Sequence, residues 1–172
     1  MQIVQLQTPI NDDMIKGLAI GDQIEISGMI LCGRDAVLPK IVERIRTDTL
    51  NTIDVSLIGA VIFHTAVSPA GIGPTTSNKV EIESSIPLLS KAGVKLHLGK
   101  GAISADTVSA LSEYNSAFAV TPPTSALFTD KMLSKRIAAF REEGMEALYE
   151  IKVKGFPAII ASVHGKTIFS GG

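Results

Sequence analysis

The sequence is poor in the residues and patterns that mark several large classes of protein. Its 172 residues include one cysteine, Cys32, which excludes a disulfide framework and is too few to hold a structural zinc ion or an iron–sulfur cluster. Lysine and arginine number 16 against 17 aspartates and glutamates, so the net charge of −1 provides no basic footprint for nucleic acid and no polybasic patch for a membrane surface. No apolar run approaches the roughly 20 residues that cross a bilayer, and the first residues lack the basic start and apolar stretch of a signal peptide. We therefore expect a cytoplasmic protein that binds neither nucleic acid nor membranes.

What the sequence does contain is enough apolar surface for a folded core. Apolar types make up 45% of the residues and charged types 19%, which is typical of a globular chain and not of a disordered one. A chain of this length buries roughly 70% of its unfolded surface when it folds as one domain. Because no linker and no repeat interrupts the pattern, we predict a single domain over residues 1–172.

Strand and helix patterns alternate along the chain and indicate a mixed α/β domain. Gly28 interrupts an apolar alternation and predicts a bulge or a close approach of another backbone. A loop is expected between the third strand and the helix that begins near residue 78. The predicted strands are 2–8, 22–33, 53–63, 94–99, 117–120 and 149–153, with a closing hairpin over 156–165; the predicted helices are 14–18 (capped by Asp12 or Asp13), 38–45, 78–91 (kinked or restarted near Pro87), one capped by Ser104, and one running from Thr129 to Gly144.

The most informative segment for chemistry is GIGPTTSNK, residues 71–79. Two glycines and a proline restrict its shape, and hydroxyl and amide side chains then lead into a predicted helix start. Exposed N–H groups and the helix dipole favour an anion at such a place, and Lys79 adds a positive charge. The segment has neither the order of a Walker loop nor that of a dinucleotide-binding turn. A capped helix start rich in turn-forming residues is the alternative interpretation.

Two more turns present a cation directly after a predicted strand. Arg34 follows the strand that ends in Cys32-Gly33, and Lys100 follows the strand that ends in Gly99. Arginine offers a fork that matches a carboxylate, and lysine offers a point charge. Open α/β sheets bind ligands at the carboxyl ends of their strands, so we expect these cations to converge with the GPTTS loop on a small carboxylate or phosphate. A solvated turn charge is the alternative for each cation taken singly.

The histidines and the cysteine have simpler interpretations than a catalytic role. His64, His97 and His164 lie within or at the ends of apolar strands without metal-ligand spacing, so we interpret them as hydrogen-bonded structural groups. Cys32, next to Gly33-Arg34, is either a reactive thiol whose pKa the arginine lowers or a small buried hydrophobe, and we favour the second.

Four segments resemble the motifs of one enzyme family, in the same order and spacing from about residue 8 to residue 169. ISGMILCGRDAV resembles the family's "SG…RDxxH" segment, and GPTTS followed by Lys79 resembles "GPTTSxRM". GVKLHLGKG resembles "GVxxxxGKG", and EALYEIKVKGFPAIIASVHGK resembles the closing "EAxWxxxVxxFPxIVxIDxxGN". The chain thus resembles the β subunits, or C-terminal domains, of iron–sulfur class I fumarases and L(+)-tartrate dehydratases.

This resemblance implies a fold, an activity and a partner. The fold would be a mixed three-layer "swivelling" β/β/α domain, and the activity a hydro-lyase that reversibly removes water from malate or a related hydroxy-carboxylate. A partner α subunit would hold the [4Fe–4S] cluster on three cysteines, its open iron acting as Lewis acid on the departing hydroxyl, in a dimer or heterotetramer. This chain would supply no metal ligand. By motif correspondence Arg34, Thr75, Thr76, Lys79 and Lys100 would bind substrate, and Thr75 would also be catalytic, in proton transfer.

The chain also departs from the family pattern at several positions. Leu38 stands where the family has a histidine, Lys79 where it has an arginine, and Ser162 where it has an aspartate. Three hypotheses therefore remain open. The chain is a subunit of a fumarate/malate-like hydro-lyase, of a dehydratase for a different hydroxy acid, or a non-catalytic carboxylate-binding or assembly module with the same fold.

Overall fold

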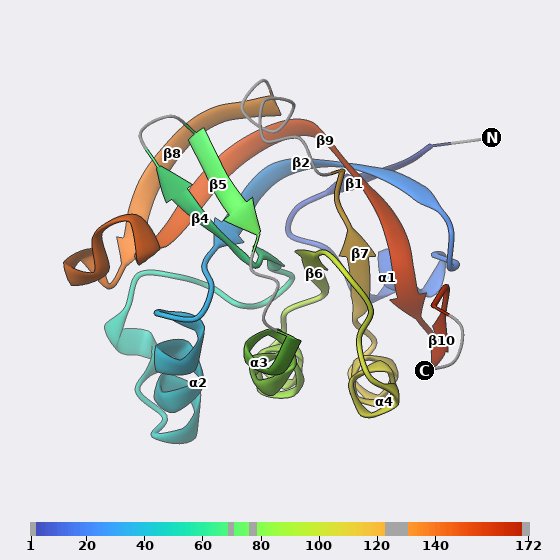
Figure 1. Cartoon of the computed structure of the whole chain (residues 1–172), viewed down its shortest axis with the longest axis horizontal. Helices are drawn as coiled ribbons and strands as arrows, with labels where there is room; N and C mark the ends of the chain where they lie inside the picture. Colours follow the sequence, from blue (N-terminus) through green and yellow to red (C-terminus); the bar gives the residue numbers. More distant parts are fainter. Residues whose placement is uncertain (1–2, 69–70, 76–78, 123–130, 170–172) are drawn as a thin grey trace.

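The computed structural model describes residues 3–68, 71–75, 79–122 and 131–169. These residues form a mixed α/β structure built on an eight-stranded sheet and a two-stranded hairpin (Figure 1). The mixed α/β class predicted from the sequence is confirmed. The large sheet contains β1 (Val4–Gln7), β2 (Gln23–Cys32), β3 (Val61–Phe63), β6 (Leu96–Gly99), β7 (Ala117–Val120), β8 (Met132–Ala139), β9 (Leu148–Val163) and β10 (Lys166–Thr167), and the hairpin contains β4 (Thr65–Ser68) and β5 (Gly71–Thr75).

The large sheet closes on itself through its longest strand. Parallel pairings run from β1 through β2, β3 and β6 to β7. The 16 residues of β9 pair antiparallel with β7 near one end and with β2 along most of their length. Strands β2, β3, β6, β7 and β9 therefore form a closed ring, and β8 and β10 pair with β9 at its two ends.

Three helices lie side by side along one side of this ring (Figure 1). Helix α3 packs against both α2 and α4, while the short α1 lies near the turn that follows α4, where Asn115 donates to the carbonyl of Asp12. No helix among the described segments combines the length and the apolar character that a bilayer crossing requires. The helices are α1 (Asp12–Lys16), α2 (Leu38–Arg46), α3 (Lys79–Lys91) and α4 (Ala105–Glu113), with two 3₁₀ helices, η1 (Leu50–Thr52) and η2 (Arg141–Glu146).

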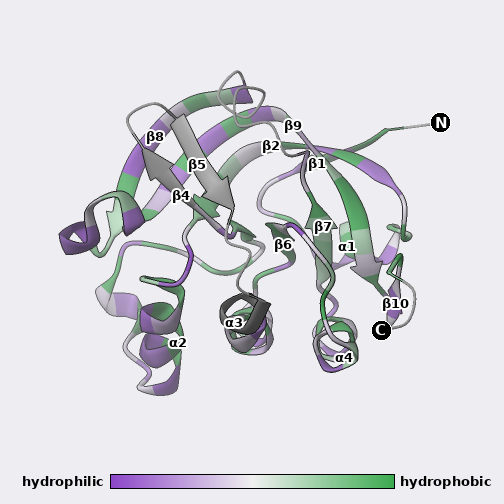
Figure 2. Cartoon of the chain, viewed as in Figure 1, coloured by the Kyte–Doolittle hydropathy of each residue, from purple (hydrophilic) through white to green (hydrophobic). Residues whose placement is uncertain are grey.

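The strands bury apolar side chains on both faces, because the sheet has a core inside the ring and another beneath the helices. Phe63 points into the ring, where its side chain meets Phe156 edge-to-face with 5.5 Å between ring centroids. Its neighbour Ile62 faces the other way, into the cluster that includes Leu38 and Leu89 of the helices. Figure 2 shows largely hydrophobic strands β6 and β7 and hydrophilic residues on α2.

Several local predictions are confirmed. The strands predicted over 2–8, 22–33, 94–99 and 117–120 are present, as are α2, the closing hairpin and α4, whose cap Ser104 accepts a hydrogen bond from the N–H of Thr107. Gly28 marks an irregularity in the β2–β9 register and has a φ of +111°. A Cβ at this position would collide with the side chain of Thr8, so only glycine lets the two segments approach.

The helix predicted from Thr129 to Gly144 is wrong. Thr129 lies outside the described residues, and Met132–Ala139 form strand β8, which pairs antiparallel with the first part of β9. The long exposed edge of β9 offers hydrogen-bond partners that the 3.6-residue apolar spacing does not reveal. Gly144 does not end an α-helix; it lies within η2 with a φ of +61°.

Three further boundaries differ from the sequence prediction. The predicted strand 53–63 is reduced to β3, because Gly59, with a φ of +73°, is held in a turn by its N–H bond to the carbonyl of Gly93 at 2.9 Å. The predicted loop after β3 instead contains strands β4 and β5. The cap of α1 is Asn11, whose side chain accepts a hydrogen bond from the N–H of Met14 at 2.8 Å. By contrast, the predicted helix 78–91 is confirmed as α3, which contains Pro87 within one helix and does not restart near it.

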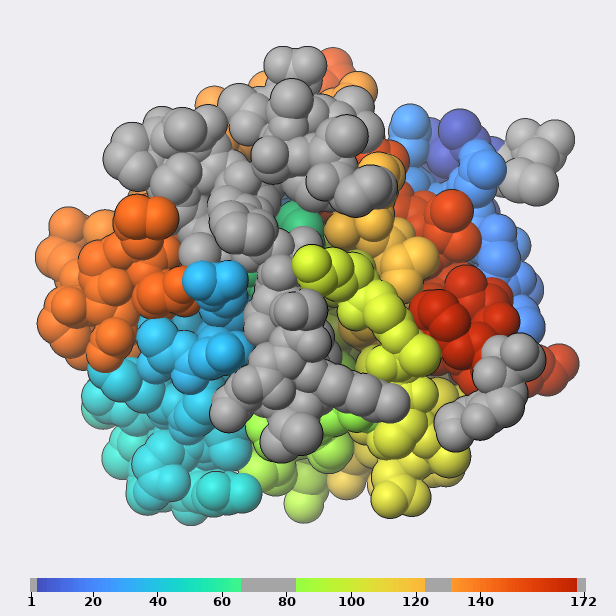
Figure 3. Space-filling view, in the orientation of Figure 1, coloured from blue at the N-terminus to red at the C-terminus, as the bar shows by residue number. Residues whose placement is uncertain are grey.

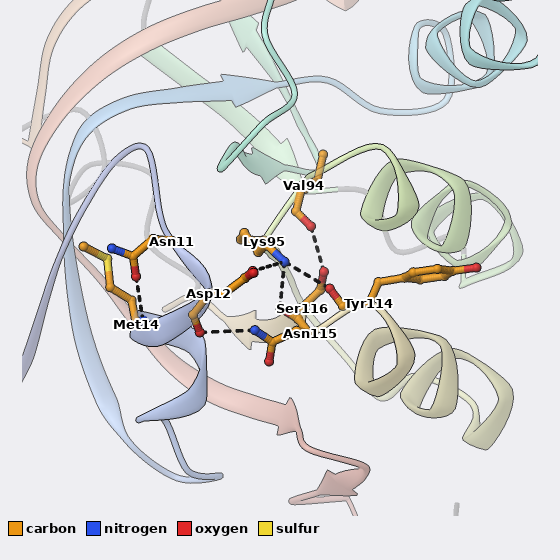
Figure 4. Close-up of polar contacts among 8 residues, drawn as sticks. All are labelled: Asn11, Asp12, Met14, Val94, Lys95, Tyr114, Asn115 and Ser116. Carbon is orange, nitrogen blue, oxygen red and sulfur yellow. Dashed lines mark hydrogen bonds and ion pairs between the residues drawn. The ribbon is translucent and has the colours of Figure 1, made fainter.

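A polar cluster ties α1 to the turns that lead into β6 and β7 (Figure 4). The Nζ atom of Lys95 lies 2.6 Å from a carboxylate oxygen of Asp12 and donates to the carbonyl of Tyr114 at 3.1 Å. Asn115 donates in turn to the carbonyl of Asp12 at 3.1 Å. Because the hydrogen bond from Lys95 and its charge favour the carboxylate form, the pKa of Asp12 is lowered. The Lys95 side chain is only 15% exposed and is the centre of this cluster.

Replacing that lysine should weaken the fold. In Lys95→Met the carbonyl of Tyr114 loses its donor, whereas water can solvate the exposed carboxylate of Asp12, so we expect the free energy of unfolding to fall by about 1 kcal/mol. Chemical denaturation at neutral pH measures this change. Lys91→Met, at an exposed position, is the matched control and should change stability by less than about 0.5 kcal/mol. Equal losses in the two variants would contradict a role for the cluster.

Candidate functional site

The carboxyl ends of three parallel strands are aligned in the structure. Cys32 of β2, Phe63 of β3 and Leu98 of β6 lie on one rung of the sheet. Backbone hydrogen bonding continues one residue beyond this rung on each side of β3. Two residues past the rung the chain reaches Arg34 after β2 and Lys100 after β6. Arg34 and Lys100, the two cations predicted to meet at this end of the sheet, therefore follow their strands at the same level of the sheet.

The GPTTS segment approaches the same end through the hairpin. Strand β4 begins directly after His64, and its first residue, Thr65, pairs with Thr75 at the end of β5. Helix α3 then begins at Lys79. The backbone at Thr75 thus lies next to the end of β3, between the strands that precede Arg34 and Lys100. Thr76 lies outside the described residues, so its predicted binding role stays a prediction, as do the roles of the other four residues.

Arg34 is not an isolated turn charge, because its guanidinium binds a carboxylate from a distant part of the chain. Its Nε atom donates to both carboxylate oxygens of Glu146, at 2.8 and 3.0 Å, and its Nη2 atom donates at 2.5 Å. The hydrogen bonds to Glu146 raise the pKa of Arg34. Both side chains are partly exposed, at 28% and 30%. Glu146 was not singled out by the sequence reasoning, although it begins the EALYEIKV segment that carries part of the family resemblance.

The 3₁₀ helix that carries Glu146 is also tied to helix α2. Lys40 Nζ lies 2.6 Å from a carboxylate oxygen of Glu143, and this interaction raises the pKa of Lys40. Lys40 Nζ also lies 5.4 Å from the ring centroid of Phe140, in cation–π range. Figure 3 shows η2 beside the start of α2, on the same face of the molecule as the segment that follows β6. The β2–α2 turn and η2 therefore form one side of the candidate site.

A chain of buried polar groups lies beneath α3, close to the strand ends. His64 Nε2 and His97 Nδ1 are 3.2 Å apart, and Ser90 Oγ lies 2.9 Å from His97 Nε2. Both imidazoles are fully buried, and burial lowers the pKa of His64 to about 4 and the pKa of His97 well below its usual value. His64 Nδ1 has no hydrogen-bond partner among the described residues. The predicted hydrogen bonding is confirmed for His64 and His97, and His164 Nε2 also lies 3.0 Å from the carbonyl oxygen of Leu18.

Cys32 is a buried apolar group. Its side chain is 0% exposed inside the ring, and burial raises the pKa of the thiol. The alternative of a thiol activated by Arg34 is therefore wrong. Within the ranges that the structure describes, no group of three histidine, cysteine, aspartate or glutamate side chains is placed to hold a metal ion. A [4Fe–4S] cluster held on three cysteines does not fit a chain with a single, buried one.

Comparison with known proteins supplies the family. All of residues 1–172 match the family model described as "Fumarase C-terminus". The chain belongs to this family. The resemblance predicted from the motifs is therefore confirmed.

This fumarase C-terminus chain covers a different share of the length of each relative. It is 26% identical over 180 residues to a protein of Geobacillus stearothermophilus that carries the name of a class I fumarate hydratase, and it covers 34% of that protein. It is 26% identical over 178 residues to the L(+)-tartrate dehydratase subunit beta of Escherichia coli (strain K12), of which it covers 86%. Fumarate hydratase 2 of Leishmania major is 25% identical over 167 residues, and 29% of it is covered. The alignments span 97%, 96% and 91% of this chain, respectively. The chain thus spans about a third of the two fumarate hydratases and most of the tartrate dehydratase subunit.

Two positions where this fumarase C-terminus chain departs from the motif pattern are buried. Leu38, at the motif's histidine position, is 2% exposed and packs in the apolar cluster with Val37 and Leu148. The side chain of this leucine is therefore part of the core. Ser162, at the motif's aspartate position, is 0% exposed in β9. Neither residue is placed to contact a ligand at the strand ends.

Proposed function

We propose that this chain is the β subunit of a hydro-lyase that adds or removes water on a small hydroxy-carboxylate of the fumarate/malate type. The observation that carries the proposal is the whole-length match to the fumarase C-terminus family, combined with strands that deliver Arg34 and Lys100 to one end of the sheet. In this proposal residues 1–172 form one domain of the three-layer swivelling β/β/α type.

The chemistry assigned to this chain is electrostatic. Removing a proton next to a carboxylate builds negative charge on that carboxylate, and fixed donors stabilise this charge most where it develops. Arg34 would supply a planar fork, and Lys79 and Lys100 point charges. The hydroxyls of Thr75 and Thr76 would complete the set of donors, with Thr75 also holding the proton that is transferred. Arg34 and Lys100 follow strand ends, Thr75 ends β5 and Lys79 begins α3, which supports this assignment for the four residues that the structure describes.

A partner would have to bring the cofactor. A [4Fe–4S] cluster does not fit this chain's single buried cysteine, so we assign it to a separate α subunit. The name of the Escherichia coli relative, a tartrate dehydratase subunit beta, supports an enzyme of more than one kind of subunit. We propose that the two subunits associate as a dimer or heterotetramer and share the site.

The isolated chain should accordingly be colourless and inactive. Anaerobic purification followed by iron and sulfide analysis and by visible absorbance tests this expectation. Cys32→Ala is the matched control and should have the same, negligible iron content as the wild type, because the buried thiol is not a ligand. A stoichiometric cluster in the chain purified without a partner would contradict the assignment.

The functional proposal itself is tested on the assembled enzyme. Anaerobic co-purification would identify the partner, and a panel of hydroxy acids with one or two carboxylates would then be assayed for water loss and addition. Turnover of the dicarboxylates supports the proposal. A cluster-loaded assembly without turnover on any of these substrates would favour a non-catalytic carboxylate-binding module.

The second candidate is a dehydratase for a different hydroxy acid. Its support is the burial of Leu38 in the core and the ammonium of Lys79 at the motif's arginine position. Compared with the motif, the chain thus lacks one imidazole and one planar guanidinium for carboxylate recognition. In the same assay, turnover confined to a monocarboxylate hydroxy acid would favour this candidate over the first.

A further inference from the structure

We propose that Glu146 is a positioning residue for substrate recognition: it fixes the guanidinium plane of Arg34 so that one face of the fork is held toward the substrate carboxylate. This inference rests on the proposed function, because it assigns a role to the partner of a proposed substrate-binding residue. Nothing in the motif comparison assigns a role to Glu146.

The contact geometry favours orientation over simple charge pairing. Glu146 binds the Nε side of the guanidinium, with both carboxylate oxygens within 3.0 Å of Nε and one of them 2.5 Å from Nη2. Contacts to two nitrogens on one edge of a planar group prevent its rotation about the terminal bonds of the side chain. A substrate carboxylate would then meet a guanidinium whose plane Glu146 has already fixed.

The fold holds the backbone at Glu146 in place from both sides. Strand β9 pairs antiparallel with β2, and Cys32 lies opposite Tyr149, so the residues just beyond β2 and just before β9 meet at the same end of the sheet. Immediately after Glu146, Ala147 and Leu148 are buried, at 1% and 0% exposure. The pairing of β2 with β9 thus brings together Arg34 and Glu146, which are 112 positions apart in the sequence.

On the other side, the ion pair between Glu143 and Lys40 anchors η2 to helix α2 at 2.6 Å. The backbone at Glu146 is therefore held between two anchored segments, which limits the positions that its carboxylate can reach. An anchored carboxylate of this kind can restrict the direction of a long, flexible arginine, which is the general requirement for a preorganised binding group.

Two other roles for Glu146 make different predictions. If Glu146 competes with substrate for Arg34, removing its charge should strengthen carboxylate binding and lower KM. If the ion pair only stabilises η2, any substitution that breaks an ion pair of η2 should have the same effect. Positioning predicts instead a loss of turnover that is specific to Glu146 and is partly restored by another carboxylate.

The test compares Glu146→Gln, Glu146→Asp and the control Glu143→Gln, which removes the same charge from the same 3₁₀ helix but breaks the pair with Lys40. In the assembled enzyme we expect Glu146→Gln to lower kcat/KM about tenfold, the lower end of the effect of losing an orienting partner in metal sites. Glu146→Asp should recover part of the loss, and Glu143→Gln, which leaves the Arg34 contact in place, should lose clearly less activity than Glu146→Gln. An unchanged or increased kcat/KM in Glu146→Gln, or an equal loss in Glu143→Gln, would overturn the proposal.

A second measurement keeps this test independent of turnover. In the ¹⁵N-labelled isolated chain, the Nε–H signal of Arg34, assigned by its absence in Arg34→Lys, should be narrow and protected from solvent exchange. It should merge with the exchanging arginine signals in Glu146→Gln and remain distinct from them in Glu143→Gln. If Glu146→Gln leaves it protected, Glu146 does not fix the guanidinium and the proposal fails.

Succinate, as a non-reacting dicarboxylate probe, separates the two proposals. If succinate shifts the Arg34 signal in the wild type and not in Glu146→Gln, positioning is supported even where turnover is absent. If succinate leaves the wild-type signal unchanged, Arg34 does not bind carboxylates and its role in the proposed function fails, while the exchange measurement still decides whether Glu146 orders the side chain.

Discussion

The free energy of unfolding should fall steeply as the pH drops from 6.5 toward 4. Burial lowers the pKa of His64 from 6.5 to about 4, and it lowers the pKa of His97 in the same direction. Across this window the folded chain keeps both imidazoles neutral, whereas the unfolded chain takes up protons. Because the unfolded state then binds more protons, stability is full above pH 6.5 and is lost as the pH falls. At 1.36 kcal/mol for each pKa unit, His64 alone should cost about 3 kcal/mol by pH 4.

Denaturant titrations at several pH values between 7.5 and 4.5 measure this loss. His64→Gln keeps a hydrogen-bonding side chain but does not titrate, so its stability should depend on pH less steeply than that of the wild type, by about one proton. Ser90→Ala is the matched control, because it removes the 2.9 Å contact to His97 without removing a titrating group. It should lower stability at every pH and leave the slope unchanged. A wild-type slope in His64→Gln would show that this histidine is not the group responsible.

Arg34→Ala should lower kcat/KM of the assembled enzyme by about 1.5–3 kcal/mol, or roughly tenfold to 150-fold, the range for a hydrogen bond to a charged group. The arginine would hold a substrate carboxylate on which charge builds as the neighbouring proton leaves. Arg34→Lys should recover only part of the activity, because an ammonium lacks the planar guanidinium that contacts Glu146 through two nitrogens.

Thermal unfolding of the same variants provides the control for this prediction. Glu146 and Arg34 are both partly exposed, so water can solvate the carboxylate that Arg34→Ala leaves behind, and the loss of stability should be modest. The kinetic effect should therefore exceed the effect on folding. Wild-type kinetics in both arginine variants, with normal folding, would remove Arg34 from the substrate site.

Part of this protein could be predicted from the sequence because the signals are local. Alternating apolar residues define β2, an i, i+3, i+4, i+7 spacing defines α2, and a serine followed by a helical pattern defines the start of α4. The family followed from four motifs in the right order, which survive at about 26% identity because glycines and cations at turns constrain the chain locally.

Other features depend on residues far apart in the sequence. Met132–Ala139 have a helical apolar spacing, yet they form strand β8 because the long β9 provides an edge that bonds their backbone. The same tertiary pairing of β2 with β9 brings Glu146 to Arg34 across 112 positions. Local patterns report backbone preference and one buried face, but not which distant strand will offer an unpaired edge.

The chemical state of the buried polar groups was likewise decided by packing. His64 and His97 are separated by 33 positions and adopt a neutral form because α3 and the sheet exclude water from both rings. Leu38 follows the RD motif at the family's histidine position, and only the docking of α2 shows that its side chain belongs to the core. The sequence by itself determined the family, the turns and the cations that they present. The tertiary structure decided which of these groups are buried, paired or directed outward, because burial and pairing are properties of the assembled layers.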